Sequence, residues 1–342
     1  MQIWMLLLGG VLLSVVIVDA LVTTIAPGSG GGPVTTPLSR GLWRLLRRLS
    51  RDPRGPLLSA SGPLAVGLIV MTWLVGLWLG WTLVFASDTS AVVSSSGDLP
   101  ADLWSRVYFA GYTIFTLGLG DVVPAGSPWQ IATVLAAGSG LFLTTLAITY
   151  ILPVMTAATE RRQQAARIAG LGHDAQEIVV NAWDGVGFDF LEQVLPDLAA
   201  ELVLTAERQL TYPILSQFHA GSITEDHHVQ LVALDEAITL LEHAVDHDRV
   251  DIHPLLLRLV RHATTQHLDR AEVSSPDDDT DAPPTLDLSP LREAGIPTVD
   301  DATFDRAVAD DLQHRQHLVA LAHATPWDRS IVVQARHRDE GD

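Results

Sequence analysis

The chain has neither cysteine nor lysine among its 342 residues. Without cysteine it can form no disulfide and no thiolate metal site, and cysteine usage does not indicate whether its compartment is oxidising or reducing. Every cation is an arginine, a bias typical of a GC-rich genome or of adaptation to salt. Basic residues are also scarce, with 21 arginines against 40 carboxylates, so we expect no nucleic acid partner.

The charge is divided unevenly along the chain. Residues 1–159 are strongly apolar and hold seven arginines and six carboxylates. Residues 160–342 hold fourteen arginines, thirty-four carboxylates and all thirteen histidines. A membrane domain followed by an acidic, water-soluble domain is therefore expected.

Three segments are long and apolar enough to cross a bilayer, whose hydrocarbon core of about 30 Å needs roughly 20 helical residues. They run from Ile3 to about Ala26, from Pro63 to Ala86 and from Trp129 to Met155. The first lacks a basic n-region and a clean cleavage site, so we interpret it as a retained helix rather than a signal peptide. Asp19 lies inside it, with either a mechanistic role or a partner in water or an arginine.

The arginines predict the orientation, because cytoplasmic loops carry the excess of basic residues. Only Arg106 lies between the second and third spans, whereas Arg161 and Arg162 directly follow the third. The loop after the first span carries six arginines: Arg40, Arg44, Arg47, Arg48, Arg51 and Arg54. We therefore expect a multi-pass protein of the cell membrane, with its N-terminus outside and its C-terminal domain in the cytoplasm. The stretch WRLLRRL in that loop is either a helix on the membrane surface or a plain linker.

A helix too short to span the membrane is predicted between the second and third spans, over residues 102–115, with Asp102 as its N-cap. Such a helix must enter the membrane and turn back, and irregular backbone at that depth has to be buried in protein or line a water-filled cavity. The sequence TLGLGD follows at residues 116–121, and its glycines permit positive φ at alternate positions. Several chains around an axis could then stack rings of carbonyl oxygens that replace the water shell of a cation.

The stretch YFAGYTIFTLGLGDVVPAG resembles the pore loop of potassium channels, whose signature is Thr-Val/Ile-Gly-Tyr/Phe-Gly-Asp. The likeness covers about residues 63–158, because an outer helix precedes the loop and an inner helix follows it. It implies K⁺ ions in the filter, no organic cofactor, and a homotetramer in the lipid bilayer. Two positions depart from the pattern: Leu119 stands where most members have Tyr or Phe, and Phe115 replaces a common threonine.

The resemblance also assigns roles to single residues. Backbone carbonyls, the first hydroxyl and an outer turn would form the filter, and these residues are Thr116, Leu117, Gly118, Leu119 and Gly120. Asp121 would support the outer end of the filter through Trp104 or Tyr108, or serve only as a turn residue.

The inner helix leaves several alternatives open. Gly140 is either a hinge or a close-packing position, and Pro153 either kinks the gate or marks the helix end. Thr144, Thr145 and Thr149 either face the water-filled cavity or bond to their own helix backbone.

The acidic half lacks the repeated β-α-β units and the glycine fingerprint of a nucleotide-binding regulator. Its apolar residues recur at three- and four-residue spacing, which predicts about six helices. Three of these are expected near residues 160–182, 188–206 and 208–219, and an acidic, Pro-rich linker is expected at 274–299.

The histidines motivate a metal or proton hypothesis. His243 and His247 are four residues apart, while His314 and His317 are three apart with Asp310 one turn earlier, and such spacings can hold zinc or a similar ion. Histidines that charge near pH 6.5 could instead give a proton response, and solvent-facing histidines are the plain alternative. With no nucleophile–base or paired-acid arrangement, we expect no catalytic residues and no enzyme.

The expected fold is an all-α membrane protein: a tetrameric potassium-channel-like pore domain with one extra N-terminal transmembrane helix and an α-helical cytoplasmic domain. The expected function is passive, potassium-selective conduction, with a tail that assembles or regulates the pore and that could take an unknown ligand, a proton or a divalent ion. The alternatives are a weakly selective cation channel and a non-conducting membrane sensor or scaffold. The expected boundaries are 1–28 for the first helix, 29–62 for an Arg-rich linker, 63–158 for the pore domain (outer helix 63–86, pore helix 102–115, filter 116–121, inner helix 128–156) and 159–342 for the tail.

Overall fold

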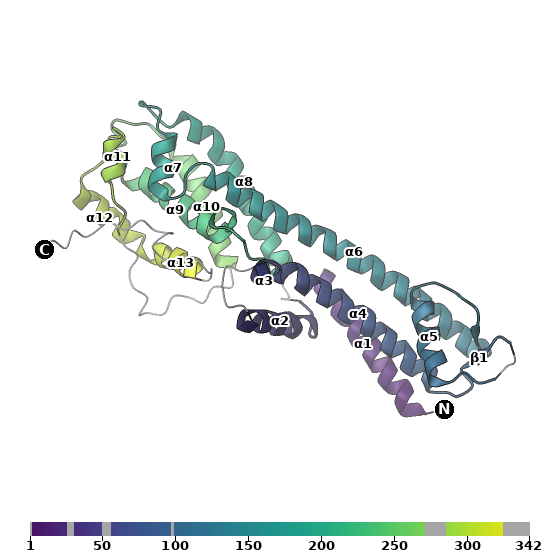
Figure 1. The fold of residues 1–342 in the computed structure, drawn as a ribbon. Coiled ribbons are helices and arrows are strands. Elements are labelled where there is room, and N and C mark those ends of the chain that lie inside the picture. Colours follow the sequence, from purple (N-terminus) through teal and green to yellow (C-terminus); the bar gives the residue numbers. More distant parts are fainter. Residues whose placement is uncertain (1, 26–30, 50–55, 97–98, 271–284, 324–342) are drawn as a thin grey trace. The chain divides into compact units, whose positions relative to one another are not determined.

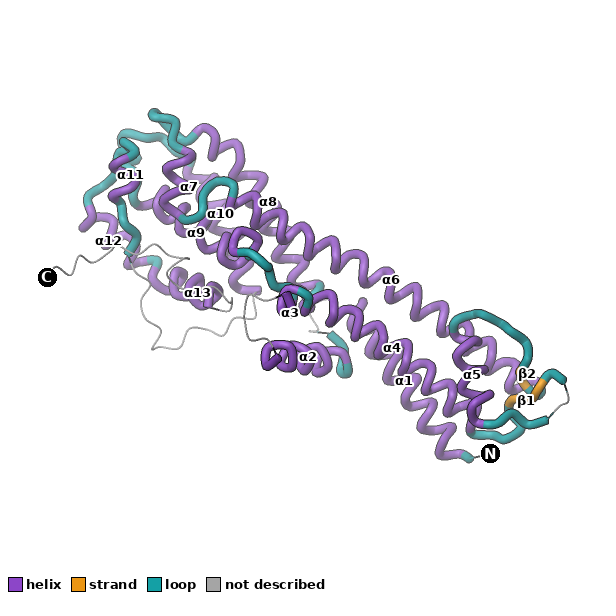
Figure 2. Tube along the Cα trace, in the orientation of Figure 1, coloured by secondary structure: helices purple, strands orange, loops and turns teal. Residues whose placement is uncertain are grey.

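The computed structural model describes residues 2–25, 31–49, 56–96, 99–270 and 285–323 (Figure 1). The described chain is helical apart from one two-stranded sheet and the loops (Figure 2), which confirms the all-α fold class. It divides into two compact units, the first formed by Met1–Leu49, Ser61–Met155 and Thr211–Gln217 and the second by the rest.

The first unit holds the membrane-spanning elements. Its elements are α1 (Ile3–Ile25), α2 (Thr35–Leu49), α4 (Ser61–Ala86), β1 (Val92–Ser94), α5 (Leu103–Ile114), β2 (Val122–Pro124), the first part of α6 (Ser127–Ala169) and the 3-10 helix η1 (Pro213–Gln217). Three helices, α1, α4 and α6, are long and apolar enough to cross a membrane, which confirms the three predicted spans.

Small residues let α1 and α4 pack closely along their length. A methyl group on Gly9 would meet the carbonyl oxygen of Gly80 at 2.8 Å, and one on Gly76 would meet a methyl of Val16 at 2.6 Å. Helices in lipid associate through such close packing because lipid tails are as apolar as the helices.

Asp19 joins three helices of this unit. Its side chain is fully buried and accepts hydrogen bonds from the backbone amides of Val34 (2.6 Å) and Thr35 (3.2 Å) and from Nε1 of Trp73 (2.8 Å). Among the described residues, the partners of this carboxylate are therefore two backbone amides at the start of α2 and an indole of α4, and no described arginine pairs with it. A carboxylate at a helix N-terminus also compensates the positive end of the helix dipole.

The segment predicted as an Arg-rich linker contains the 15-residue helix α2. Four arginines recur on it at helical spacing and are exposed: Arg40, Arg44, Arg47 and Arg48. Leu46 is buried, whereas Leu45 and Leu49 are exposed, so α2 is amphipathic. The stretch WRLLRRL is therefore helical, while its position on the membrane surface stays a prediction. Arg51 and Arg54 lie outside the described residues.

The second unit is a helical domain built around α9. Its elements are α3 (Pro56–Ser59), the end of α6, α7 (Ala175–Ala182), α8 (Asp189–Thr211), the 3-10 helix η2 (Ile223–Glu225), α9 (His227–His243), α10 (Pro254–Arg270), α11 (Ser289–Glu293), α12 (Asp301–Asp310) and α13 (Leu312–His323). Residues of α9 are buried on every side, and α7, α10, α12 and α13 pack against it. Such a helix is a core helix, and it buries polar residues such as Asp235 and Glu236 together with its apolar ones.

Several predicted tail boundaries differ from the structure. The helix expected over 160–182 breaks between Ala169 and Ala175, where Asp174 caps α7. The helix expected over 188–206 continues to Thr211, and a short 3-10 helix begins at Pro213 in place of the one expected over 208–219. Proline fixes its own φ and restricts the residue before it, so a new element begins there.

The described part of the acidic linker predicted over 274–299 is not a linker. Residues 274–284 lie outside the described residues. From Thr285 onward the chain belongs to the core, because Leu286, Leu288 and Leu291 are buried around α11. The high content of Pro and Asp concealed these apolar residues.

Candidate ion-conducting pore loop

Two tryptophans of α4 hold the pore helix α5 and the inner helix α6 in place. Nε1 of Trp78 donates to the carbonyl of Val107 in α5 (2.8 Å), and Nε1 of Trp81 donates to Oγ of Ser139 in α6 (2.9 Å). At the start of α5, Asp102 accepts from the backbone amide of Ser105 (2.8 Å), which confirms the predicted N-cap. The short helix is therefore fixed at its start and along its length.

The C-terminus of α5 leads directly into the hexapeptide TLGLGD. The amide of Thr116 donates to the carbonyl of Thr113 (3.0 Å), and the amide of Leu117 donates to the carbonyl of Tyr112 (2.8 Å). This pair of bonds is the Schellman motif, whose C′ residue adopts the left-handed conformation and is usually glycine. Here a threonine fills that position with φ +56°, a strained conformation for a β-branched residue.

The backbone alternates through the hexapeptide. Thr116, Gly118 and Gly120 have φ of +56°, +59° and +79°, whereas Leu117 and Leu119 between them do not have positive φ. The prediction of positive φ at alternate positions is thus confirmed, and it extends to Thr116. Alternation of this kind aims successive carbonyls to one side, as a ring of ion-coordinating oxygens requires.

The outer end of the hexapeptide is tied to the preceding loop. Strands β1 and β2 pair antiparallel, with Val93 opposite Val123. The carbonyl of Asp121 accepts from both the amide and the hydroxyl of Ser95 (3.1 Å each), and the hydroxyl of Tyr112 donates to the carbonyl of Val122. Bonds from the loop after β1 and from α5 therefore fix this end of the segment.

The two predicted partners of Asp121 behave differently. The Asp121 carboxylate accepts from the amide of Val122 (3.1 Å), and it interacts electrostatically with the phenol of Tyr108. Trp104 is 78% exposed, and no hydrogen bond joins it to Asp121 among the described residues. Of the two predicted partners, only Tyr108 influences Asp121 within one chain, and its support of the filter stays a prediction.

The inner helix passes tightly over the end of α5 at Gly140. A methyl group built on Gly140 would clash with the carbonyl of Ile114, the last residue of α5. Of the two interpretations of this glycine, the observed packing supports the close-packing role. Pro153 lies inside α6, which continues to Ala169, so it does not mark the helix end.

The inner-helix threonines bond to their own backbone. The hydroxyls of Thr144, Thr145 and Thr149 donate to the carbonyls of Gly140 (2.9 Å), Leu141 (2.9 Å) and Leu146 (2.9 Å). All three threonines are also exposed. Backbone bonding satisfies the hydroxyl hydrogen and leaves the oxygen lone pairs free, so it does not prevent contact with a cavity.

In the second unit the predicted metal-binding histidines are not brought together. Nε2 of His247 lies 3.2 Å from the carbonyl of Glu242, and Nδ1 of His317 lies 2.9 Å from that of Gln313. His314 pairs with the buried Asp235 (2.9 Å), and Asp310 joins none of these pairs among the described residues. Among the described residues, Asp310, His314 and His317 therefore form no group of three potential ligands.

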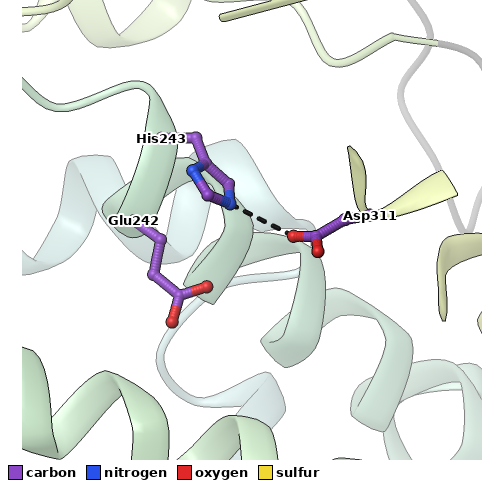
Figure 3. A group of neighbouring side chains, drawn as sticks. All are labelled: Glu242, His243 and Asp311. Atoms are coloured by element: carbon purple, nitrogen blue, oxygen red, sulfur yellow. Dashed lines mark hydrogen bonds and ion pairs between the residues drawn. The ribbon is translucent and has the colours of Figure 1, made fainter. Parts of the chain in front are cut away.

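His243 does belong to a different group. Its Nε2 lies 3.1 Å from Oδ2 of Asp311, and Glu242 lies beside it on α9 (Figure 3). Sequence reasoning missed both carboxylates. Asp311 is 68 positions from His243, and no local spacing signals that contact.

A second cluster was also missed, at the junction of η2, α9 and α10. The rings of His227 and His267 are 4.7 Å apart, and the guanidinium of Arg161 lies 2.9 Å from Nε2 of His228. Burial, then Arg161 and Arg270, lowers the pKa of His267 to about 3. Burial likewise lowers the pKa of His227 and His228 well below the usual value, so all three imidazoles are neutral near pH 7. The adjacent pair HH at 227–228 was the only signal in the sequence.

Three helices that can cross a bilayer, and a short helix leading into a loop of alternating φ between two of them, define a membrane protein of the pore-loop class. The family model described as "Ion channel" matches residues 66–157, which contain most of α4, the pore loop and the part of α6 that belongs to the first unit. The "Uncharacterized membrane protein YdjJ" of Bacillus subtilis (strain 168) is 33% identical over 316 residues, or 92% of each chain. The chain belongs to the two-transmembrane pore-loop ion channel family. No solved structure matches it.

Proposed function

We propose that the protein is a potassium-selective channel that conducts passively through a filter formed by Thr116, Leu117, Gly118, Leu119 and Gly120. The observation that carries this proposal is the alternation of backbone conformation through these residues. Positive φ at every second residue directs carbonyl oxygens to one side, where K⁺ can exchange its water shell for them. The hydroxyl of Thr116 adds a further oxygen at the inner end.

The proposed assembly is a homotetramer around one pore. The filter segment is exposed in the single chain, and Leu117 and Leu119 are 65% and 58% exposed. Burying these two leucine side chains against neighbouring copies would remove apolar surface from contact with water. A cation site also needs oxygens from several directions, which a single loop does not supply. Each chain carries one pore loop, so four copies are proposed.

The proposed orientation places the N-terminus and the β1–β2 pair outside and the second unit in the cytoplasm. The arginines of α2 and those that follow the third span support this orientation through the positive-inside rule. In this orientation the C-terminal end of α5 points inward, and its partial negative charge stabilises a cation below the filter.

Potassium selectivity is tested by the reversal potential of purified full-length protein in a planar bilayer, with K⁺ on one side and Na⁺ on the other. The expected value lies near the K⁺ equilibrium potential, because the carbonyl rings replace the K⁺ water shell. A matched control is Gly118→Ala, which places a side chain at φ +59° and is expected to abolish the current.

A weakly selective cation channel is the second proposal, and Leu119 motivates it. An aromatic residue at this position normally braces the filter in the family that the loop resembles, whereas the Leu119 side chain is 58% exposed in the single chain. A reversal potential near zero would favour this second proposal. The absence of current from correctly assembled tetramers would instead favour a membrane sensor or scaffold.

A further inference from the structure

The last turn of α9 meets the junction of α12 and α13 in a compact group of potential ligands. Glu242, His243 and Asp311 each offer one donor atom, and the three atoms lie within 4.8 Å of one another (Figure 3). Two of the donors are carboxylate oxygens and one is an imidazole nitrogen, a set that suits divalent first-row metals. We propose that this group binds a divalent transition metal ion of the Zn²⁺ type.

The separation of two donors already fits a bound ion. Nε2 of His243 and Oδ2 of Asp311 are 3.1 Å apart. Two ligand atoms about 2.1 Å from one ion, at angles of about 90–110°, lie roughly 3.0–3.4 Å apart. Without metal, the N–H of a neutral imidazole can donate to the carboxylate across this distance. An ion bound between the two atoms would require the tautomer in which Nε2 carries no hydrogen.

The charge around the group favours a cation. Burial lowers the pKa of Arg261, but the carboxylates of Asp235, Glu242 and Asp311 raise it overall. One guanidinium thus faces three carboxylates, and two negative charges are left for a divalent ion to neutralise. Glu242 binds Arg261 through Oε2 at 2.8 Å, which leaves its other carboxylate oxygen for the metal.

The group is accessible without being fully exposed. The side chains of Glu242, His243 and Asp311 are 20%, 28% and 37% exposed. Partial burial strengthens the attraction between ligands and ion, and the remaining opening admits the ion and a water as fourth ligand. The bound ion would connect the end of α9 to the turn between α12 and α13.

The buried histidine cluster of the same unit is less suited to a metal. Its three imidazoles are neutral, as metal ligands must be. However, the guanidinium of Arg161 occupies the position in front of Nε2 of His228, at 2.9 Å. A cation there would meet a fixed positive charge, whereas the group around Asp311 presents an excess of carboxylates.

The test is a Zn²⁺ titration by calorimetry of full-length protein purified without a histidine tag, repeated with Co²⁺ to read ligand geometry from its visible absorption. Wild-type protein is expected to bind one ion per chain in this group. His243→Gln and Asp311→Asn are each expected to weaken that binding by at least about tenfold, since even partners of ligands contribute this much. Matched controls are His247→Gln and Asp310→Asn, which alter neighbouring residues outside the group and are expected to leave the affinity unchanged.

A second readout is thermal unfolding, because an ion that binds only the folded state raises the unfolding midpoint. If Asp311→Asn does not fold, Glu242→Gln decides the matter, since its amide oxygen keeps an acceptor for Arg261 while the charge is lost. The proposal is overturned if wild-type protein shows no saturable binding, or if His243→Gln binds as tightly as wild type. Metal binding is read without ion conduction, so either result is independent of the proposed channel function.

Discussion

At the scale of single residues, Thr116 combines a strained backbone with a useful hydroxyl. A β-branched residue at φ +56° costs about 1–3 kcal/mol, which glycine at the same position would not. Glycine in turn lowers the free energy of unfolding by about 0.4–1 kcal/mol, because it gives the unfolded chain more conformational entropy. The strain therefore persists because the side chain contributes something that glycine lacks, and the proposed contribution is an oxygen at the inner end of the filter.

The prediction is that Thr116→Gly leaves the thermal stability of the assembled protein within about 2 kcal/mol of wild type, because the two effects oppose each other. The same variant should lose selectivity for K⁺ over Na⁺ in reversal-potential measurements. Thr116→Ser keeps the hydroxyl and serves as the control that stays selective. Unchanged selectivity in Thr116→Gly would show that the hydroxyl takes no part in ion binding.

At the scale of elements, helices α9 and α10 bury three neutral histidines beside Arg161 of α6. His227, His228 and His267 are held neutral by burial, and the charged or titratable groups that face them are Arg161, Arg270, His219 and Asp226. In the unfolded chain the same histidines titrate near 6.5. Below that pH the unfolded state binds more protons than the folded state, so stability falls as the pH falls.

The expected slope is up to about 1.4 kcal/mol per pH unit for each buried histidine, between pH 6.5 and the folded pKa, which is about 3 for His267. Urea unfolding of the full chain at pH 7.5, 6.5 and 5.5 measures this slope. His267→Gln should reduce it, whereas His262→Gln, an exposed neighbour on α10, should not. An equal slope in wild type and His267→Gln would show that His267 does not contribute to the pH dependence of stability.

At the scale of the whole molecule, the lack of native cysteine makes the proposed orientation directly measurable. Ser96 in the loop after β1 and Ser216 in η1 are both exposed. A membrane-impermeant maleimide should label Ser96→Cys in intact cells and Ser216→Cys only after permeabilisation. The cysteine-free wild-type chain is the blank, and the reverse pattern would invert the topology.

Features coded by local signals could be predicted from the sequence. Asp102 caps α5, and an Asp that follows a proline by two residues is a local signal for the start of a helix. The glycines at 118 and 120 permit positive φ by themselves. The left-handed Thr116 could not be foreseen, because two backbone bonds to the preceding helix impose that conformation on a residue that disfavours it.

Contacts between distant residues escaped the sequence reasoning for a different reason. Asp19 finds its partners in the first amides of α2, and backbone amides carry no residue identity to recognise. Asp311 was overlooked in favour of Asp310, because helical spacing within one segment says nothing about the helix that packs across from it. The fold class follows from hydropathy alone, whereas these pairings depend on tertiary packing.

The absence of space between Gly140 and the carbonyl of Ile114 has a mechanical consequence. The inner helix and the foot of the filter touch backbone to backbone there, with no flexible side chain to absorb movement. Tilting α6 at this height therefore displaces the last turn of α5, and with it the residue that begins the filter. In the proposed channel, a movement of the inner helix and a change in the shape of the filter would therefore be mechanically coupled.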